Sequence, residues 1–569
     1  MSTIAAQLEQ AKAQLTQAGA PFELTTIDSD GAAYRAFKNA PQTLTQLAAP
    51  SRALGDKCFL VYEDERWSYE QFFQHVDALA GQLVHQHQIG KGDRVAVAMR
   101  NYPEWMSAFL AIVSIGAVAV PLNSWGTAAE LAYGLTNAQV RLVFCDQPRL
   151  EAMLPTLEKK HIRAVVARSG DRDLGAYAVH YGDVVEAGRG GQPPRVALST
   201  DDPAIILYTS GTTGKPKGAL SRHRNVCQAI FSLTFAAACA AIVNPDTIEK
   251  MAASGFEPSS LLCVPLFHVS GCHSVFLVNL LAGRKIAIMH KWDADKALEC
   301  IERERITTFA GVPTMVRQLM ESKHFDETDT SSLFGMGGGG AASPPQLAEL
   351  IYNKKPHAFA GTGYGLTETN ATGASSTGIA YRQKPTSAGT LSPLIELEIR
   401  DEDGAVLDST ATGHIWLRGI SLMCGYWDAA SATVQLLEDG WFNTEDIGYM
   451  DDEGFLFLVD RAKDMIIRGG ENIYAAEIEA CIAGHPAVDE VVAFGVPHDE
   501  LGEELAVAVH PRDGRAIDEA EIRDHVAQRL ARFKVPTHVV LSAQELPKNA
   551  TGKLQKKIVR AAFLENHQP

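Results

Sequence analysis

The chain has 569 residues, of which 46% are hydrophobic and 21% charged, an ordinary composition for a globular protein with several folding units. Its formal net charge of −17 argues against a nucleic acid as a main partner, because phosphate backbones are bound by basic faces. The nine cysteines form no C-x-x-C pair, which indicates neither a disulfide framework nor a zinc site and favours a reduced, cytoplasmic setting.

The first segment, residues 1–19, predicts a polar, weakly amphipathic helix that ends at Gly19, without the features of a signal peptide. The longest apolar stretch, residues 108–122, is shorter than the ~20 residues that span a bilayer. We expect it to form a buried helix that runs into a strand. No transmembrane segment is predicted, whereas peripheral membrane contact and a homodimer stay open.

Helical periodicity alternates with short β-rich runs from about residue 67 to residue 390, for example at 94–99 and 140–145. This alternation predicts an α/β fold with mostly parallel sheets flanked by helices. After residue 395, short strand patterns surround an Asp-Gly turn, and residues 448–461 have the pattern of another hairpin. These patterns predict a small antiparallel β unit at about 390–459. A compact α+β tail follows, so we predict a large N-terminal domain, 1–459, and a C-terminal domain, 460–569.

The segment "YTSGTTGKPKGA", residues 208–219, follows an apolar run and combines glycines, hydroxyls and lysines. It is not the nucleotide P-loop, because Gly211 and Gly214 are only three positions apart and Lys215 is followed by Pro216. Glycines still let backbone N–H groups approach an anion, and hydroxyls and lysines add donors and positive charge. The sequence therefore predicts a phosphate-binding loop made of Thr209, Ser210, Gly211, Thr212, Thr213, Gly214, Lys215 and Lys217.

Six further motifs follow in chain order: "PLFHVSG" (265–271), "GMGGGGAASP" (335–344), "GYGLTET" (363–369), "WFNTEDIGY" (441–449), "DRAKDMIIRGGENIYAAEIE" (460–479) and "PKNATGK" (547–553). In this order the chain resembles the adenylate-forming superfamily of acyl-CoA synthetases, firefly-type luciferases and peptide-synthetase adenylation domains. The resemblance implies an enzyme that joins a carboxylic acid to ATP, giving acyl-AMP and pyrophosphate, and then transfers the acyl group to the thiol of coenzyme A. It also implies a C-terminal domain that moves between the two steps.

The resemblance assigns a role to most of the motif residues. Thr367 would contact the phosphates, Glu368 would hold Mg²⁺, and Tyr364 would stack on the adenine. Gly339, Gly340, Ala341 and Gly365 would border the nucleotide, Asp446 would bind the ribose hydroxyls, and Arg461 would reach the ribose or the phosphates. Gly469 and Gly470 would line the pantetheine path, and Lys553 would be the mobile catalytic lysine. Glu445 departs from the family pattern, which has glycine there, so the turn before Asp446 is in question.

Several alternatives stay open. His268 lies at the carboxylate end of the acyl pocket by resemblance, but a packed core histidine also fits, and no ligand spacing supports a metal there. The acyl acceptor is CoA or a carrier-protein thiol, and a non-catalytic nucleotide sensor is the alternative from another class. Pocket candidates are Val269, Ser270, Cys272, residues 309–314 and Gly335 to Gly338. Their small size favours a medium-to-long fatty acid or a bulky cyclic or aromatic acid as the substrate.

Overall fold

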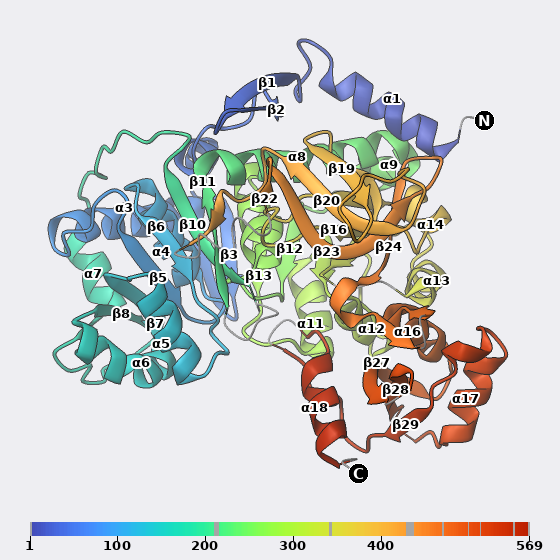
Figure 1. The fold of residues 1–569 in the computed structure, drawn as a ribbon. Helices are drawn as coiled ribbons and strands as arrows, with labels where there is room; N and C mark the ends of the chain where they lie inside the picture. The colour runs from blue at the N-terminus through green and yellow to red at the C-terminus, as the bar shows by residue number, and fades with distance from the viewer. Residues whose placement is uncertain are drawn as a thin grey trace.

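Two large sheets form most of the molecule, and a smaller sheet forms its C-terminal part (Figure 1). This computed structural model describes residues 3–209, 216–340, 344–427, 437–468, 471–498, 500–512, 514–549 and 552–566. Helices cover both large sheets, so the predicted α/β fold class is confirmed.

The first large sheet has eight strands, and its inner strands run parallel. In spatial order they are β21 (Gly425–Tyr426), β11 (Lys217–Arg222), β10 (Pro203–Thr209), β6 (Val118–Pro121), β5 (Arg94–Ala98), β7 (Leu142–Asp146), β8 (Arg163–Ala167) and β9 (Ala178–His180). The helices that alternate with these strands are α3 (Tyr69–His85), α4 (Pro103–Ser114), α5 (Ala128–Asn137), α6 (Gln147–Lys160) and α7 (Tyr181–Gly188). The apolar runs predicted as strands at 94–99 and 140–145 are β5 and β7, and both are buried, as parallel strands covered by helices must be.

The second large sheet has 14 strands and joins two parts that the sequence analysis separated. Its parallel part is β3 (Cys58–Tyr62), β13 (Lys285–Ile288), β12 (Ser259–Leu262), β14 (Thr308–Gly311), β15 (Gly335–Gly339) and β16 (Phe359–Tyr364), with β4 (Glu65–Ser68) at the edge. Its antiparallel part is β17 (Ala374–Thr377), β18 (Gly389–Leu391), β24 (Phe455–Arg461), β23 (Trp441–Met450), β20 (Gly413–Gly419) and β19 (Ile395–Arg400), with β22 (Leu437–Glu438) beside β23. The strands of the predicted small β unit are antiparallel, as expected. They do not form a separate sheet, because β17 and β18 connect them to the parallel part.

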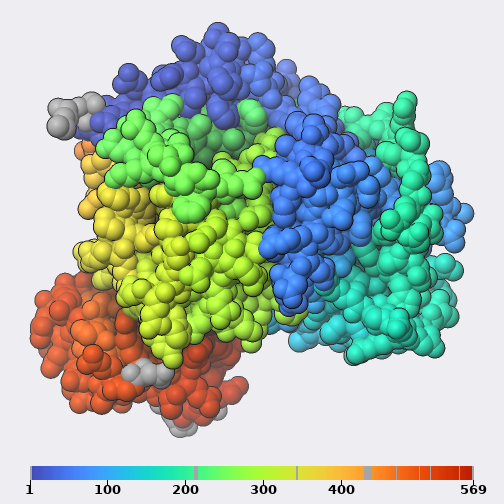
Figure 2. All heavy atoms as spheres, turned by 180° about the vertical axis from the view of Figure 1, so that it is seen from behind, coloured from blue at the N-terminus to red at the C-terminus, as the bar shows by residue number. Residues whose placement is uncertain are grey.

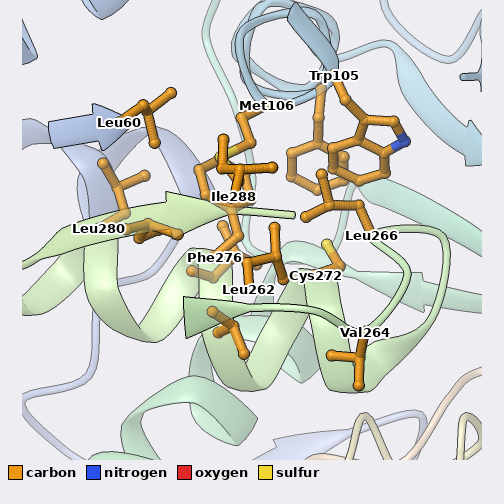
Figure 3. Packing of buried hydrophobic residues seen from close by; sticks show 14 of the residues in the cluster. Leu60, Trp105, Met106, Leu262, Val264, Leu266, Cys272, Phe276, Leu280 and Ile288 are labelled. Atoms are coloured by element: carbon orange, nitrogen blue, oxygen red, sulfur yellow. The ribbon is translucent and has the colours of Figure 1, made fainter. Parts of the chain in front are cut away.

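The main core lies around α4, where apolar side chains from both large sheets meet. In α4, every residue from Pro103 to Val113 is buried, and a helix that is buried all round must be apolar on all faces. Figure 3 shows Trp105 and Met106 of this helix packed with Ile288, Leu262 and Phe276. The predicted buried helix within residues 108–122 is thus the second half of α4, followed by β6.

The expectation that residues 108–122 are the longest apolar segment is wrong, because helix α8 (His223–Val243) is a longer one. Among the described residues it is the one helix long and apolar enough to cross a membrane, but half of its most apolar window is buried inside the protein. A mostly buried helix of a soluble protein passes the same test of length and composition, so α8 is weak evidence for a membrane span. Polar residues such as Gln228, Ser232 and Thr234 interrupt its apolar run in the sequence.

The N-terminal segment lies across α8 and reaches the far end of the second sheet (Figure 1). It consists of α1 (Ile4–Thr16), which ends before the predicted Gly19, and the hairpin of β1 (Leu24–Ser29) and β2 (Ala32–Phe37). The backbone of Phe37 hydrogen-bonds Gln228 of α8 at 2.8 and 3.0 Å, and Arg418 of β20 donates to the Ala33 carbonyl at 3.0 Å. This segment therefore contacts residues that follow it by 191 to 385 positions in the chain.

The C-terminal part gathers at one corner of the molecule, as its orange and red atoms show in Figure 2. Its sheet has five strands, β25 (Ile466–Arg468), β26 (Glu471–Ile473), β27 (Val488–His498), β28 (Gly502–Pro511) and β29 (His538–Leu541). The helices α16 (Ala475–Ala483), α17 (Glu519–Ala527) and α18 (Lys556–Asn566) complete it. Ion pairs join it to α12 (Pro313–Glu321): Arg317 binds Asp489 at 2.8 Å, and Glu321 binds Arg512 at 3.1 Å.

Candidate active site

The predicted phosphate loop connects β10 to β11, which form an antiparallel hairpin. Thr209 and Lys217 face each other as the last pair of this hairpin, at the carboxyl end of a parallel strand. Ligands of open α/β sheets bind at that end of the strands. Six of the predicted loop residues lie outside the described residues: Ser210, Gly211, Thr212, Thr213, Gly214 and Lys215.

Lys217 and Glu368 both contact Tyr426, a residue that the sequence analysis did not single out. The Lys217 ammonium lies 5.2 Å from the centre of the Tyr426 ring, and the Tyr426 hydroxyl donates to Glu368 Oε1 at 2.7 Å. Burial raises the pKa of Glu368, although the bond from Tyr426 acts against this. Tyr426 belongs to the two-residue strand β21, whose position depends on pairing with β11, so no local sequence pattern identifies it.

Tyr364, Asp446 and Arg461 form the centre of the site. Tyr364 at the end of β16 donates its hydroxyl to Asp446 Oδ2 at 2.7 Å, and Arg461 Nε lies 2.8 Å from Asp446 Oδ1. The pairing of β23 with β24 sets Asp446 directly opposite Arg461. Burial raises the pKa of Asp446, and the guanidinium of Arg461 opposes that rise. The structure therefore brings together three residues that the sequence assigned to the nucleotide from three separate motifs.

Glu445, the departure from the family pattern, adopts a left-handed backbone conformation with a φ of 60°. The pairing of β20 with β23 is irregular here, because Trp416 pairs with Asn443 and His414 with Ile447. The Glu445 N–H donates to Asn443 Oδ1 at 2.9 Å, which holds the turn. Glu445 therefore adopts the backbone conformation that glycine adopts most easily, and Asp446 still lies beside Tyr364 and Arg461.

The glycines of β15 allow the backbones of neighbouring strands to approach closely. A Cβ on Gly338 would lie 2.2 Å from the Gly311 carbonyl oxygen, and one on Gly339 would lie 2.9 Å from the Gly363 oxygen. Gly340 has a φ of 81°, and Ala341 lies outside the described residues. Gly337 and Gly338 also border a small cavity of about 10 Å³ beside Pro313 and Val316. The predicted acyl wall of glycines thus has little open volume next to it.

The turn after β16 carries Gly365, Thr367 and Glu368 and is held by Asn370. A Cβ on Gly365 would lie 2.5 Å from the Ala371 backbone, so this position has room only for glycine. Asn370 donates to Ser221 Oγ and to the Ser421 carbonyl, both at 2.9 Å, and its Oδ1 lies 3.1 Å from His273 Nε2. The Thr367 carbonyl accepts the Asn370 N–H at 3.1 Å.

His268 stands at the start of a π-helix, η2 (Ser270–Leu277), and its ring lies 4.5 Å from that of Phe267. Burial lowers the pKa of His268 to about 4, so its imidazole is neutral at pH 7. Among the described residues, the structure shows no ion pair or side-chain hydrogen bond between His268 and the Asp446 cluster. His273, five residues later, makes the contact with Asn370 that the sequence analysis did not foresee.

Lys553 extends from the C-terminal part toward the Asp446 cluster. Lys553 is exposed as a whole residue, but desolvation of its amine lowers the pKa of Lys553, and the charge of Arg461 adds to this effect, whereas Asp446 acts in the opposite direction. The turn before it has Gly552 with a φ of 81°, and a Cβ there would meet Val312 at 3.4 Å. Gly469 and Gly470 lie outside the described residues. In the part of the chain that the structure describes, no group of three or more His, Cys, Asp or Glu side chains could hold a metal ion.

Comparisons with known proteins agree with this arrangement. A family model described as "AMP-binding enzyme" matches residues 47–427, and one described as "AMP-binding enzyme C-terminal domain" matches residues 477–553. The chain is 32% identical to the long-chain-fatty-acid–CoA ligase FadD13 of Mycobacterium tuberculosis, over 84% of this chain and 89% of the relative. It is 34% identical to a feruloyl-CoA synthase of Amycolatopsis sp, over 87% of this chain and 94% of the relative.

The fold is similar to that of solved structures as well. ATP-bound MatB from Rhodopseudomonas palustris superimposes with a TM-score of 0.80 at 28% identity, covering 92% of this chain and all of MatB. Together, the two family models span the phosphate loop, Tyr364 and Lys553, whereas Asp446 and Arg461 lie between the two matched ranges. The chain belongs to the AMP-binding enzyme family, the adenylate-forming enzymes of the acyl-CoA synthetase type.

Proposed function

We propose that the protein is an AMP-forming acid–CoA ligase acting on a medium-to-long fatty acid or a bulky cyclic or aromatic acid. In the first step an oxygen of the carboxylate bonds to the α-phosphorus of ATP, and the bond from that phosphorus to the bridging oxygen breaks, releasing pyrophosphate. In the second step the thiol sulfur of CoA bonds to the acyl carbon, AMP leaves, and the thiol proton passes to solvent.

The observation that carries this proposal is the convergence on Asp446. Tyr364, Arg461 and Lys553 come from three segments of the chain and all act on this one carboxylate. A buried carboxylate is a suitable acceptor for two ribose hydroxyls. Lys553 supplies a positive charge where two anions, the acid and the α-phosphate, must approach each other, which is the main electrostatic obstacle to acyl-AMP formation.

Glu368 fits a magnesium site. Mg²⁺ is usually held by one or two carboxylates together with phosphate oxygens and water, and it neutralises phosphate charge when bound. Glu368 is such a carboxylate, and its partner Tyr426 also has the Lys217 ammonium over its ring. The Tyr426 hydroxyl bond leaves one of the two carboxylate oxygens for a metal.

We also propose that residues 460–569 turn as a unit about Asp460 between the two steps. Asp460 accepts hydrogen bonds from the Arg461 N–H at 2.7 Å and from the Ala476 N–H of α16 at 3.3 Å, so it joins the last strand of the large sheet to the C-terminal part. The orientation described here, with Lys553 near Asp446, suits the first step.

The names of the relatives favour CoA as the acceptor but differ in the acid. FadD13 is named for long-chain fatty acids, the Amycolatopsis enzyme for ferulate, and a Bacillus cereus relative, 31% identical, for 2-succinylbenzoate. Loading of a carrier-protein thiol is the second candidate, since it requires the same first step.

The decisive experiment is ATP–pyrophosphate exchange with the purified protein and a panel of carboxylic acids. We expect exchange that requires both an acid and Mg²⁺, is abolished by EDTA, and is followed by AMP and thioester formation when CoA is added. Release of ADP and orthophosphate would contradict the proposal. Thioester formation with a carrier protein but not with CoA would favour the second candidate.

A further inference from the structure

The turn that carries Thr367 and Glu368 is followed by two consecutive residues in the left-handed region. Asn370 has a φ of 52° and Ala371 a φ of 68°, a conformation that asparagine tolerates better than alanine does. Ala371 also lies against Gly365, where a Cβ would meet its backbone at 2.5 Å. Strained backbone of this kind persists only where the surrounding structure holds it, and it is concentrated at functional sites. The groups that hold this turn therefore bear on the site.

The side chain of Asn370 is fully buried and bonds three other segments of the chain. Its amide nitrogen donates to Ser221 Oγ and to the Ser421 carbonyl, both at 2.9 Å, and its amide oxygen lies 3.1 Å from His273 Nε2. Ser221 belongs to β11, Ser421 to the segment that leads into β21, and His273 to the π-helix η2. Asn370 thus connects the turn to the phosphate-loop hairpin, to the segment before β21 and to the π-helix.

These contacts fix which way the Asn370 amide points and which nitrogen of His273 carries the proton. A carbonyl oxygen only accepts, so the Asn370 atom that bonds the Ser421 carbonyl must be the amide nitrogen. The amide oxygen then faces His273, whose Nε2 must donate. Burial lowers the pKa of His273 to about 4, so its ring is neutral at pH 7 and holds a single proton. His273 is therefore a buried donor, a role that glutamine can take over and leucine cannot.

The segment before β21 also holds Glu368 directly. The Glu368 carbonyl accepts the Met423 N–H at 2.8 Å, and the Tyr426 hydroxyl donates to the Glu368 carboxylate at 2.7 Å. Within the turn, the Asn370 N–H bonds the Thr367 carbonyl at 3.1 Å. Loss of the Asn370 side chain would release the turn from β11 and from η2, while the contacts of Met423 and Tyr426 remain.

We infer that Asn370 is a positioning residue for the carboxylate of Glu368, and that His273 holds the Asn370 amide in this role. This inference rests on the proposed function, in which Glu368 binds Mg²⁺. Groups one step removed from a ligating carboxylate orient it, and their loss typically costs about 10–100-fold in metal affinity or activity. The π-helix that contains His273 starts two residues after His268, so the metal side of the site and the predicted acid side share one hydrogen bond.

The experiment measures ATP binding by isothermal titration calorimetry without any acid, once with Mg²⁺ and once with EDTA. The variants are His273→Leu, His273→Gln and Asn370→Gly, the last of which keeps the left-handed backbone but removes the amide. We expect His273→Leu and Asn370→Gly to weaken binding with Mg²⁺ by about tenfold or more and to leave binding in EDTA within ~2-fold of the wild type. His273→Gln should recover most of the loss, because its amide nitrogen replaces Nε2 as the donor.

Asn279→Ala is the matched control. Asn279 of α10 (Val278–Ala282) is also a buried asparagine, but it bonds Ser260 Oγ at 3.0 Å and the Val275 carbonyl at 2.7 Å, which belong to β12 and η2 and not to the turn. Its loss should lower the free energy of unfolding in urea and leave the effect of Mg²⁺ on ATP binding unchanged.

ATP–pyrophosphate exchange gives a second reading. In His273→Leu the Mg²⁺ concentration for half-maximal exchange should rise by about tenfold, while thioester formation from synthetic acyl-AMP stays near the wild-type rate. Equal weakening of ATP binding with Mg²⁺ and with EDTA, or equal losses in His273→Leu and His273→Gln, would overturn the inference alone. The comparison of these two variants decides even if Asn370→Gly does not fold. A wild type that shows no Mg²⁺-dependent exchange with any acid would instead contradict the proposed function.

Discussion

Glu445 keeps the backbone turn before Asp446, although its own backbone conformation is strained. A non-glycine residue in the left-handed region is less stable by roughly 1–2 kcal/mol than in its ordinary conformations. Here the hydrogen bond to Asn443 and the pairing of β23 on both sides hold Glu445 at a φ of 60°. The strain therefore lies directly beside Asp446.

We expect Glu445→Gly to raise the free energy of unfolding by up to ~1 kcal/mol, because glycine adopts this φ without strain. Glu445→Val should lower it by ~1 kcal/mol or more, since a β-branched side chain is worst in this conformation. Urea denaturation measures both. Glu402, an exposed turn residue whose φ is not positive, is the control, and Glu402→Gly should be slightly destabilising. If Glu402→Gly raised the free energy of unfolding by the same amount, relief of strain at Glu445 would not be the cause of the stabilisation.

Lys553 should matter in only one of the two half-reactions. Its charge is needed while the carboxylate and the α-phosphate approach, so Lys553→Ala should reduce acyl-AMP formation by ~10²–10³-fold. With synthetic acyl-AMP and CoA, the same variant should form the thioester at close to the wild-type rate. Lys557→Ala, on the exposed face of α18, serves as the control and should preserve both rates. A similar loss in both half-reactions would assign Lys553 a structural role.

The rate of acyl-AMP formation should also fall as the pH rises through the pKa of Lys553. Only the protonated amine carries the charge, and burial and Arg461 lower this pKa below the ordinary value of 10.5. The loss should therefore begin at a lower pH than for a solvated lysine. In Lys553→Arg, whose guanidinium stays charged, whatever activity remains should not show this alkaline decline. If the alkaline decline in rate were unchanged in Lys553→Arg, a group other than Lys553 would be responsible for it.

At the scale of elements, local patterns predict most strands, the buried helix α4 and the hairpin that carries Asp446. They do not predict which strands pair, because contacts such as that of β18 with β24 join residues more than sixty positions apart. The same reason hides Tyr426, whose place depends on β11. Family motifs indicate site residues one by one, whereas the close approach of Gly338 to Gly311, which rules out any side chain there, is a property of the two neighbouring strands β14 and β15.

At the scale of the whole molecule, two ion pairs hold the C-terminal part against α12. Arg317 with Asp489 and Arg512 with Glu321 are partly exposed, so each contributes about 0.2–1 kcal/mol. If residues 460–569 turn between the steps as proposed, both pairs exist only in the orientation that brings Lys553 to Asp446. Their combined effect on the balance of the two orientations would be up to roughly 30-fold.

The double variant Arg317→Ala/Arg512→Ala should therefore slow acyl-AMP formation by up to roughly 30-fold and leave thioester formation from synthetic acyl-AMP unchanged or faster. Measuring the two half-reactions separately tests this. Arg523→Ala, which removes a pair with Glu519 inside the C-terminal part, should change neither. Slowing of both half-reactions together would mean that these pairs stabilise the fold and not one orientation.

The packing of the N-terminal segment has a consequence for synthesis on the ribosome. Ala33 meets Arg418, a partner 385 residues further along the chain. At about 5–20 residues per second, roughly 20–80 s pass between the emergence of the two. During that time the hairpin of β1 and β2 and the apolar face of α1 have no native partner at the far end of the sheet. The first segment to be made can therefore dock on α8 once residue 228 has emerged, but its docking is complete only after residue 418 follows.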